Sequence, residues 1–140
     1  METLRITAGP FIFLARKETR AAPRTCAAFD RLLPFRRQLI HARWSGEACW
    51  IPLGDFQLGV DHENSTGHPA AGQLLFHPGG PSETEILVPY GVARFASQAG
   101  PLTGNHFLTI VGGAEQLPEL GRLVLWQGAQ DILFEQAAGC

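Results

Sequence analysis

The stretch TGNHFLTIVGG, residues 103–113, is the part of the chain around which the rest is organised. Its apolar run, residues 107–111, predicts a buried β-strand that begins near Gly104 and ends at Gly112 and Gly113. Asn105 and His106 form a polar pair at the mouth of that strand. Polar side chains at the entrance of a buried strand are typical of binding sites, so we expect a candidate site here.

Outside this stretch, short apolar segments alternate with turns. The 16 glycines and 10 prolines favour short strands over long helices. Residues 59–71 are rich in His, Gly, Ser, Asn and Pro and predict a long surface loop. The remaining strands are expected near residues 4–6, 11–15, 38–44, 48–51, 72–77, 84–88, 92–96 and 131–136.

Two segments have the apolar spacing of a helix. The first opens at Pro23, with Thr25 as the expected cap, and Pro34 ends it. Its expected apolar stripe is Cys26, Phe29, Leu32 and Leu33. The second helix covers residues 114–126, with Pro118 in its first turn. About eight strands and two helices predict a mainly β, closed or nearly closed antiparallel barrel, because closure removes exposed strand edges. A chain of 140 residues holds such a core in one domain, residues 1–140.

The charge distribution is uneven. Only Arg94 and Arg122 lie beyond Arg43, so nine of the eleven basic residues are in the first third of a chain whose net charge is −2. These arginines are interleaved with apolar residues and form no run, which indicates solvated surfaces. We therefore expect no nucleic-acid partner.

The three cysteines, Cys26, Cys49 and Cys140, form no CxxC motif and indicate neither a disulfide framework nor a zinc knuckle. Cys26 and Cys49 stand in apolar patterns and are expected in the core, and Cys140 receives no role. The start METLRIT lacks a signal-peptide pattern, and the early apolar run is too short to span a bilayer. We expect a cytoplasmic protein without a membrane partner; a homo-oligomer remains open.

The first helix resembles that of cyclophilins. Pro23, Thr25, Phe29 and Leu32 have the spacing of the Pro-x-Thr-x-x-x-Phe-x-x-Leu text that opens that helix. The segment Gly-Asn-His-Phe-Leu at residues 104–108 is similar to the cyclophilin Gly-Lys-His-Val-Val segment, whose histidine lines the proline-binding groove. The Arg, Phe and Gln of the cyclophilin groove have no counterpart between Arg37 and Asp55.

The chain also resembles short bacterial cyclophilin-like proteins of uncharacterised function. The shared texts are Trp-x-Gly-Glu (residues 44–47), Glu-Asn-x-Thr (63–66), a Pro-Gly-Gly turn followed by Glu85, Tyr-Gly (90–91), Gly-Asn-His-Phe (104–107) and Trp-x-Gly-Ala-Gln (126–130). The resemblance implies a closed or nearly closed eight-stranded cyclophilin-like barrel with two helices. It implies no particular reaction.

His106, with Glu63 and Glu47, is the candidate for acid-base catalysis, because imidazole and carboxyl groups transfer protons near neutral pH. Asn105 and Asn64 are candidate substrate-binding amides. The alternative for His106 is a histidine satisfied within the barrel wall, and the alternative for Glu63 and Asn64 is a solvated loop.

The other candidates flank predicted turns. Glu47 and Glu85 offer a carboxylate pair, with solvation as the alternative. Trp44 and Tyr90 are candidate pocket walls, whereas Trp126 fits a core position better. Arg43 is a candidate clamp for a carboxylate substrate, with a solvated surface as its alternative.

Metal and cofactor motifs are weak. His62-Glu63 matches the start of a helical metalloprotease motif, but Thr66 stands where the second histidine belongs. His62, His68 and an acid remain a minor alternative for a metal site, and we predict no metal. No nucleophile elbow, phosphate loop or dinucleotide fingerprint is present, so we predict no cofactor.

Three functions follow. The first is a small-molecule-binding protein; whether it also catalyses a reaction stays open, and the reaction would be that of a cofactor-free hydrolase, isomerase or lyase on a small polar substrate with an amide or carboxylate group. The alternative is a peptide-binding module or degenerate peptidyl-prolyl isomerase around His106. The third is a structural subunit that packs on a partner enzyme.

Overall fold

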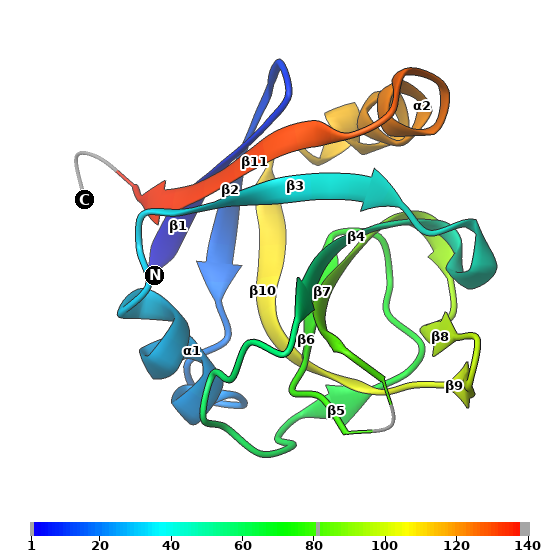
Figure 1. The fold of residues 1–140 in the computed structure, drawn as a ribbon. Coiled ribbons are helices and arrows are strands. Elements are labelled where there is room, and N and C mark those ends of the chain that lie inside the picture. Colours follow the sequence, from blue (N-terminus) through cyan, green and yellow to red (C-terminus); the bar gives the residue numbers. More distant parts are fainter. Residues whose placement is uncertain (1, 81, 138–140) are drawn as a thin grey trace.

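The computed structural model describes residues 2–80 and 82–137. Eight strands build the barrel: β1 (Thr3–Ala8), β2 (Phe11–Lys17), β3 (Phe35–His41), β4 (Gly46–Gly54), β6 (Gln73–His77), β7 (Thr84–Ala93), β10 (Gly104–Gly112) and β11 (Gln130–Gln136). Their order around the barrel is β2-β1-β11-β3-β4-β7-β6-β10, and antiparallel pairing of β10 with β2 closes it (Figure 1). The predicted mainly β, closed eight-stranded barrel is confirmed.

The remaining elements are small. They are β5 (Ser65–Thr66), β8 (Ala96–Ser97), β9 (Gly100–Pro101), the helices α1 (Pro23–Asp30) and α2 (Leu117–Gln127), and the 3-10 turns η1 (Arg43–Ser45) and η2 (Ala114–Gln116). The two helices lie at opposite ends of the barrel (Figure 1). The strand predicted from residues 103–113 is β10, with Asn105 and His106 inside it.

Side chains alternate between the barrel interior and its outer face, as the period of a strand requires. On β7, Ile86 and Val88 belong to the main interior cluster, whereas Leu87 belongs to a second cluster on the outer face. Residues 94–103 cross that outer face, and Phe95 and Leu102 pack there against β4, β6 and β7. This part of the sheet is therefore buried on both faces: its inner face lies in the barrel core, and its outer face lies beneath residues 94–103.

Gly104 is required where the covering segment meets β10. A Cβ atom at this position would lie 2.9 Å from the ring of Phe95 and 3.0 Å from the Cβ of Leu75. The groups that pack closely against the backbone at Gly104 are therefore the side chains of Phe95 and Leu75.

Helix α1 closes one end of the barrel through Phe29, whose ring makes edge contacts at 5.2 Å with Phe35, Phe107 and Phe134. The predicted cap at Thr25 is wrong. The helix begins at Pro23, so Thr25 lies inside the first turn and its backbone N–H donates instead to Glu63. The helix also ends before Leu32 and Leu33, which pack on the core as partly buried residues beyond it.

Helix α2 closes the other end, and Pro118 lies in its first turn as predicted. Tyr90 continues the inward-facing row of β7 and lies directly under Gly121 of this helix. A Cβ atom at Gly121 would come within 2.3 Å of the Tyr90 ring. Gly121 thus allows the helix to approach β7 closely.

The prediction of separate strands at residues 84–88 and 92–96 is wrong, because β7 continues through Pro89, Tyr90 and Gly91. The register between β4 and β7 shifts between Gly46 and Ala48, and the Glu47 carboxylate accepts a hydrogen bond from the backbone N–H of Val92 at 2.8 Å. This bond satisfies the backbone N–H of Val92 where the strand pairing shifts, so Pro89, Tyr90 and Gly91 remain within β7 although such residues commonly form turns.

Cys26 and Cys49 are buried as predicted. Burial, reinforced by the charge of Asp30, raises the pKa of Cys26 to about 11, and burial raises that of Cys49 to about 12. Both thiols therefore remain protonated near neutral pH and act as small core side chains. Cys140 lies outside the described residues.

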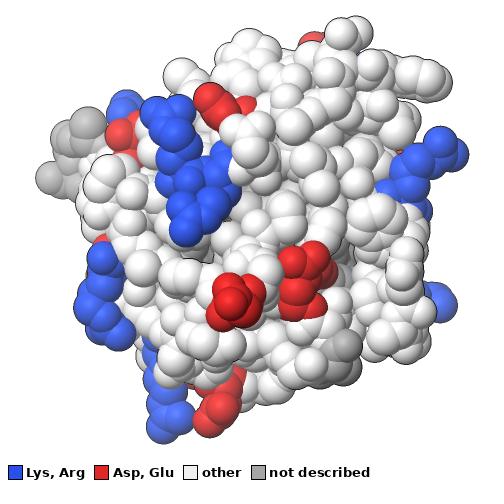
Figure 2. All heavy atoms as spheres, in the orientation of Figure 1, with Lys and Arg blue, Asp and Glu red and all other residues white. Residues whose placement is uncertain are grey.

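Figure 2 shows one face of the molecule, where basic side chains lie in separate groups toward the edges and two acidic groups lie near the middle. This face does not carry a continuous basic surface. Over the part of the chain that is described, no helix is long and apolar enough to cross a membrane.

Replacing Gly121 by alanine tests the contact with Tyr90. In an exposed helix interior this change stabilises by up to about 1 kcal/mol, because alanine loses less backbone entropy. Here we expect it to lower the free energy of unfolding by about 1–3 kcal/mol, because the new methyl group overlaps the ring. Urea denaturation measures the difference, and an increase in stability would contradict the close packing.

Candidate functional site

The contacts of the nine residues predicted for the site divide into three groups. His106, Asn105, Glu63 and Asn64 meet where the loop of residues 55–66 crosses β10 and α1. Glu47, Tyr90 and Arg43 lie near the end of the barrel under α2, and Trp44 and Glu85 line a pocket on the outer face.

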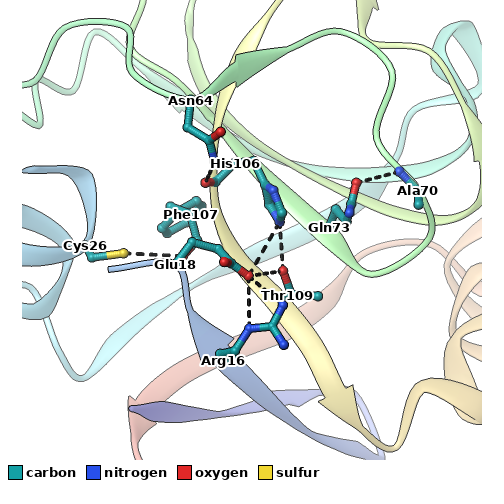
Figure 3. Close-up of polar contacts among 9 residues, drawn as sticks. All are labelled: Arg16, Glu18, Cys26, Asn64, Ala70, Gln73, His106, Phe107 and Thr109. Atoms are coloured by element: carbon teal, nitrogen blue, oxygen red, sulfur yellow. Dashed lines mark hydrogen bonds and ion pairs between the residues drawn. The ribbon is translucent and has the colours of Figure 1, made fainter. Parts of the chain in front are cut away.

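The His106 side chain is 17% exposed and is held by a chain of hydrogen bonds (Figure 3). Its Nε2 lies 2.7 Å from Oγ1 of Thr109, which donates to the Glu18 carboxylate at 2.5 Å. Because the threonine hydroxyl has one hydrogen and gives it to Glu18, Nε2 of His106 must be the donor in its own bond. Both sequence interpretations of His106 fit this geometry.

Arg16 fixes the far end of that chain, since its Nε and Nη2 donate to Oε2 of Glu18 at 3.2 and 2.9 Å. Burial raises the pKa of Glu18, but the hydrogen bonds from Thr109 and Arg16 and the charge of Arg16 outweigh it, so the net shift is downward. Burial lowers the pKa of His106 despite the nearby Glu18 charge. A neutral imidazole beside an ionised Glu18 is expected at neutral pH.

Asn105 is fully buried, at 0% exposure, and its amide makes four hydrogen bonds. Nδ2 donates to Oγ1 of Thr25 and to the carbonyl of Asp61 at 3.0 and 2.9 Å. Oδ1 accepts from the Glu63 N–H and the Ser65 hydroxyl at 3.1 and 3.2 Å. All four bonding positions are used within the chain, so this amide joins β10, α1 and the loop.

Glu63 and Asn64 complete the same junction. Oε1 of Glu63 accepts from the backbone N–H and the hydroxyl of Thr25 at 2.6 and 2.8 Å, which satisfies a donor in the first turn of α1. Asn64 has a φ of 50° and donates to the carbonyl of His106 at 2.8 Å. The sequence was right that these residues converge, and their catalytic and binding roles stay predictions.

At the opposite end of the barrel, the Tyr90 hydroxyl lies 2.7 Å from Nε2 of His41. Burial raises the pKa of Tyr90 and lowers that of His41, with Arg43 adding to the second effect. Glu47 is engaged by Val92, and Arg43 is exposed. Trp126 is 76% exposed on α2, which contradicts a core position.

The pocket on the outer face has a volume of about 390 Å³. It lies between the sheet and the hairpin of β8 and β9. Trp44 and Trp50 meet edge to face in its wall, with ring centroids 5.6 Å apart. Its lining residues are Trp44, Trp50, Ser82, Glu83, Glu85, Ser97, Gln98 and Ala99. None of the lining residues is a lysine or arginine.

Glu85 is the unusual group in this pocket. The residue is 4% exposed and lines the pocket. Burial, and secondarily the charge of Glu83, raises its pKa to about 8. The indole N–H of Trp50 is also buried without a partner. The pocket therefore holds a neutral carboxyl at neutral pH, and an unpartnered indole N–H is buried behind its wall.

Sequence reasoning missed Trp50, Glu83, Glu18 and Thr109. Trp50 could have been found from its alternation with Ala48, because both face outward on β4. The signal at Glu85 was a single carboxyl within the apolar strand TEILV, which favours burial over solvation. The minor alternative of a metal site from His62, His68 and an acid is not assembled, since no group of three His, Cys, Asp or Glu residues suited to a metal occurs in residues 2–80 and 82–137.

The chain belongs to the family described as protein of unknown function (DUF3830), whose family model matches residues 4–136. No curated protein matches the chain. A solved structure of McbB in complex with tryptophan is similar, with a TM-score of 0.74 and 16% sequence identity. The match covers 98% of this chain and 45% of the McbB chain, so this chain spans less than half of that length.

The solution structure of the hypothetical protein AF2241 from Archaeoglobus fulgidus is similar with a TM-score of 0.55 and 15% identity, over 97% of this chain and 95% of AF2241. At such low identities the likeness concerns the fold alone. The relationship to cyclophilins stays a prediction.

Replacing Asn105 by leucine separates a structural role from a binding role. The change removes the four hydrogen bonds of this amide to Thr25, Asp61, Glu63 and Ser65, so we expect the free energy of unfolding to fall by about 2–4 kcal/mol. Denaturant unfolding measures it. Gln57→Ala is the control, because its exposed amide has only a 3.5 Å contact with Asp55. A variant as stable as the control would contradict the structural role.

The raised pKa of Glu85 predicts an unusual dependence of stability on pH. Below the ordinary pKa of 4.5 the carboxyl is protonated in both states, and between 4.5 and about 8 only the unfolded chain releases the proton. Stability should therefore fall as pH rises through this window. The full loss, on the order of 5 kcal/mol, is reached above pH 8.

Glu85→Gln should remove this loss, so the variant becomes more stable than the wild type at pH 9 relative to pH 5. Urea denaturation at both values measures it, and the exposed Glu115→Gln is the matched control. A wild-type to variant difference that is the same at pH 5 and pH 9 would refute a raised pKa.

Proposed function

We propose that this member of the DUF3830 family binds a small arylalkylamine, an alkyl amine that carries an aromatic ring, in the pocket beside Glu85, and that Glu85 exchanges a proton with it. The observation that carries the proposal is a buried carboxyl group with a pKa near 8 in a pocket walled by two indoles. Such a group is rare outside functional sites, because burying a carboxyl without partners costs stability.

The walls support an aromatic ligand. A volume of about 390 Å³ lies in the usual range for small-molecule sites. Trp44 and Trp50 offer a ring face and a ring edge, which favour contact with a further aromatic ring. The similar McbB barrel has been solved in complex with tryptophan, which carries both an aromatic ring and an alkyl amino group.

The charges support an amine more than the carboxylate substrate suggested by the sequence. Glu83 and Glu85 are the ionisable lining residues, and the absence of lysine and arginine from the lining leaves an anionic ligand without a counter-charge. An ammonium group would lie close to both carboxyls and to the tryptophan faces, where cations bind favourably.

Glu85 gives the pocket a chemical capability. A carboxyl with a pKa close to the working pH can donate or accept a proton without a large penalty either way. Cofactor-free hydrolases, isomerases and lyases all depend on such transfers. Among the predicted catalytic residues, His106, Glu63 and Glu47 have other partners within the chain, so Glu85 takes the acid-base role in this proposal.

Three indoles that differ in charge test the ligand class: tryptamine, tryptophan and indole-3-acetate. We expect tryptamine to bind most tightly and indole-3-acetate most weakly, measured by titration calorimetry. Because a bound cation favours ionised Glu85, the affinity for tryptamine should rise toward tenfold per pH unit between pH 6 and pH 8.

Glu85→Gln should weaken tryptamine binding and abolish this pH dependence. Glu83→Gln is the matched control; it removes a charge at the exposed rim, where screening is strong, and should keep the pH dependence. Tighter binding of indole-3-acetate than of tryptamine would overturn the ligand class. An unchanged pH profile in Glu85→Gln would overturn the role of Glu85.

The alternative, a peptide-binding module or degenerate prolyl isomerase around His106, stays a prediction. The side chain of His106 bonds to Thr109, and its carbonyl accepts a hydrogen bond from Asn64. Because these polar groups already have partners within the chain, the Glu85 pocket is favoured as the site.

A further inference from the structure

His77 is a buried histidine with one unused nitrogen. The residue is 1% exposed, and its Nδ1 lies 2.7 Å from the carbonyl oxygen of Thr103. A carbonyl only accepts, so Nδ1 carries the hydrogen. With the hydrogen on Nδ1, the lone pair of the imidazole lies on Nε2. That atom is buried without a hydrogen-bond partner.

His62 faces His77 with the same arrangement of its two nitrogens. Nδ1 of His62 lies 3.2 Å from the hydroxyl of Ser65, and that hydroxyl donates to Oδ1 of Asn105. The serine oxygen must therefore accept from Nδ1–H of His62, so the lone pair of this imidazole tautomer lies on Nε2. The two ring centroids are 6.1 Å apart, with an angle of 64° between the rings.

We propose that His62 and His77 bind one divalent transition-metal ion, such as Zn²⁺, through their Nε2 atoms. Imidazole nitrogens bind zinc at about 2.0–2.1 Å, so two rings on one ion have centroids about 5–6 Å apart. The observed separation of 6.1 Å is close to this range, and His62 is exposed on its loop, where its ring can turn toward His77. Both histidines line a pocket of about 190 Å³ together with Pro101, Leu102 and Thr103.

The hydrogen bonds of the two histidines support a metal site over a simple contact between the two rings. Histidine ligands commonly donate their second N–H to a carbonyl or another acceptor that fixes the tautomer and the ring direction. The Thr103 carbonyl and the Ser65 hydroxyl do this for His77 and His62 respectively. Since no third His, Cys, Asp or Glu ligand joins them within residues 2–80 and 82–137, water or a small ligand completes the coordination. This site replaces the sequence-based prediction of no metal.

Titration calorimetry of the full chain with Zn²⁺ alone tests the site. We expect one ion per chain, and weakening of at least about tenfold in each of His62→Ala and His77→Ala. His62 is exposed, so His62→Ala should fold normally even if the buried His77→Ala variant does not, and thermal unfolding checks both. His68→Ala is the matched control from the same loop and should bind Zn²⁺ like the wild type.

A second measurement identifies the ligand atoms. In long-range ¹H–¹⁵N spectra, Zn²⁺ should shift the Nε2 resonances of His62 and His77 and leave those of His41 and His106 unchanged. The proposal is overturned if wild type shows no saturable Zn²⁺ binding, if His62→Ala binds as well as wild type, or if His68→Ala loses as much affinity as His62→Ala.

Discussion

The packing of residues 94–103 on the outer face of β4, β6 and β7 sets the chemistry of this protein. An open barrel face would leave its outward side chains in water. Here Phe95 and Leu102 pack against Ala48, Leu75 and Leu87 and exclude solvent from that face. Glu85 and His77, which are cross-strand partners on β7 and β6, lie on the same face. Their shifted pKa values have this burial as their largest cause.

The polar junction at Asn105 has the opposite character. Its amide is as deeply buried as Glu85, but four hydrogen bonds satisfy it, so burial costs little and the contacts hold the loop on the barrel. The comparison separates two kinds of buried polar group. A satisfied group stabilises the fold, whereas a group without partners remains available to a ligand.

The barrel could be predicted because alternation, turn residues and the two helical stripes agree over most of the chain. The continuity of β7 through Pro89, Tyr90 and Gly91 could not be predicted. It is accompanied by a hydrogen bond from the Val92 N–H to the Glu47 carboxylate, and these two residues are far apart in sequence. For the same reason His106 and Asn105 were found as a polar cluster while their partners Glu18 and Thr25 were not. Trp44 and Glu85 were named, but their shared pocket depends on a hairpin whose place on the sheet no local pattern encodes.

The central claim is that Glu85 is a protonated carboxylic acid at neutral pH. ¹³C NMR titration of the glutamate side-chain carboxyl carbons, with the Glu85 signal assigned by its loss in Glu85→Gln, tests this directly. We predict an inflection for that signal near pH 8, well above the ordinary value of 4.5. An inflection near 4.5 would mean that Glu85 is hydrated and ionised, and it would contradict the pocket as described.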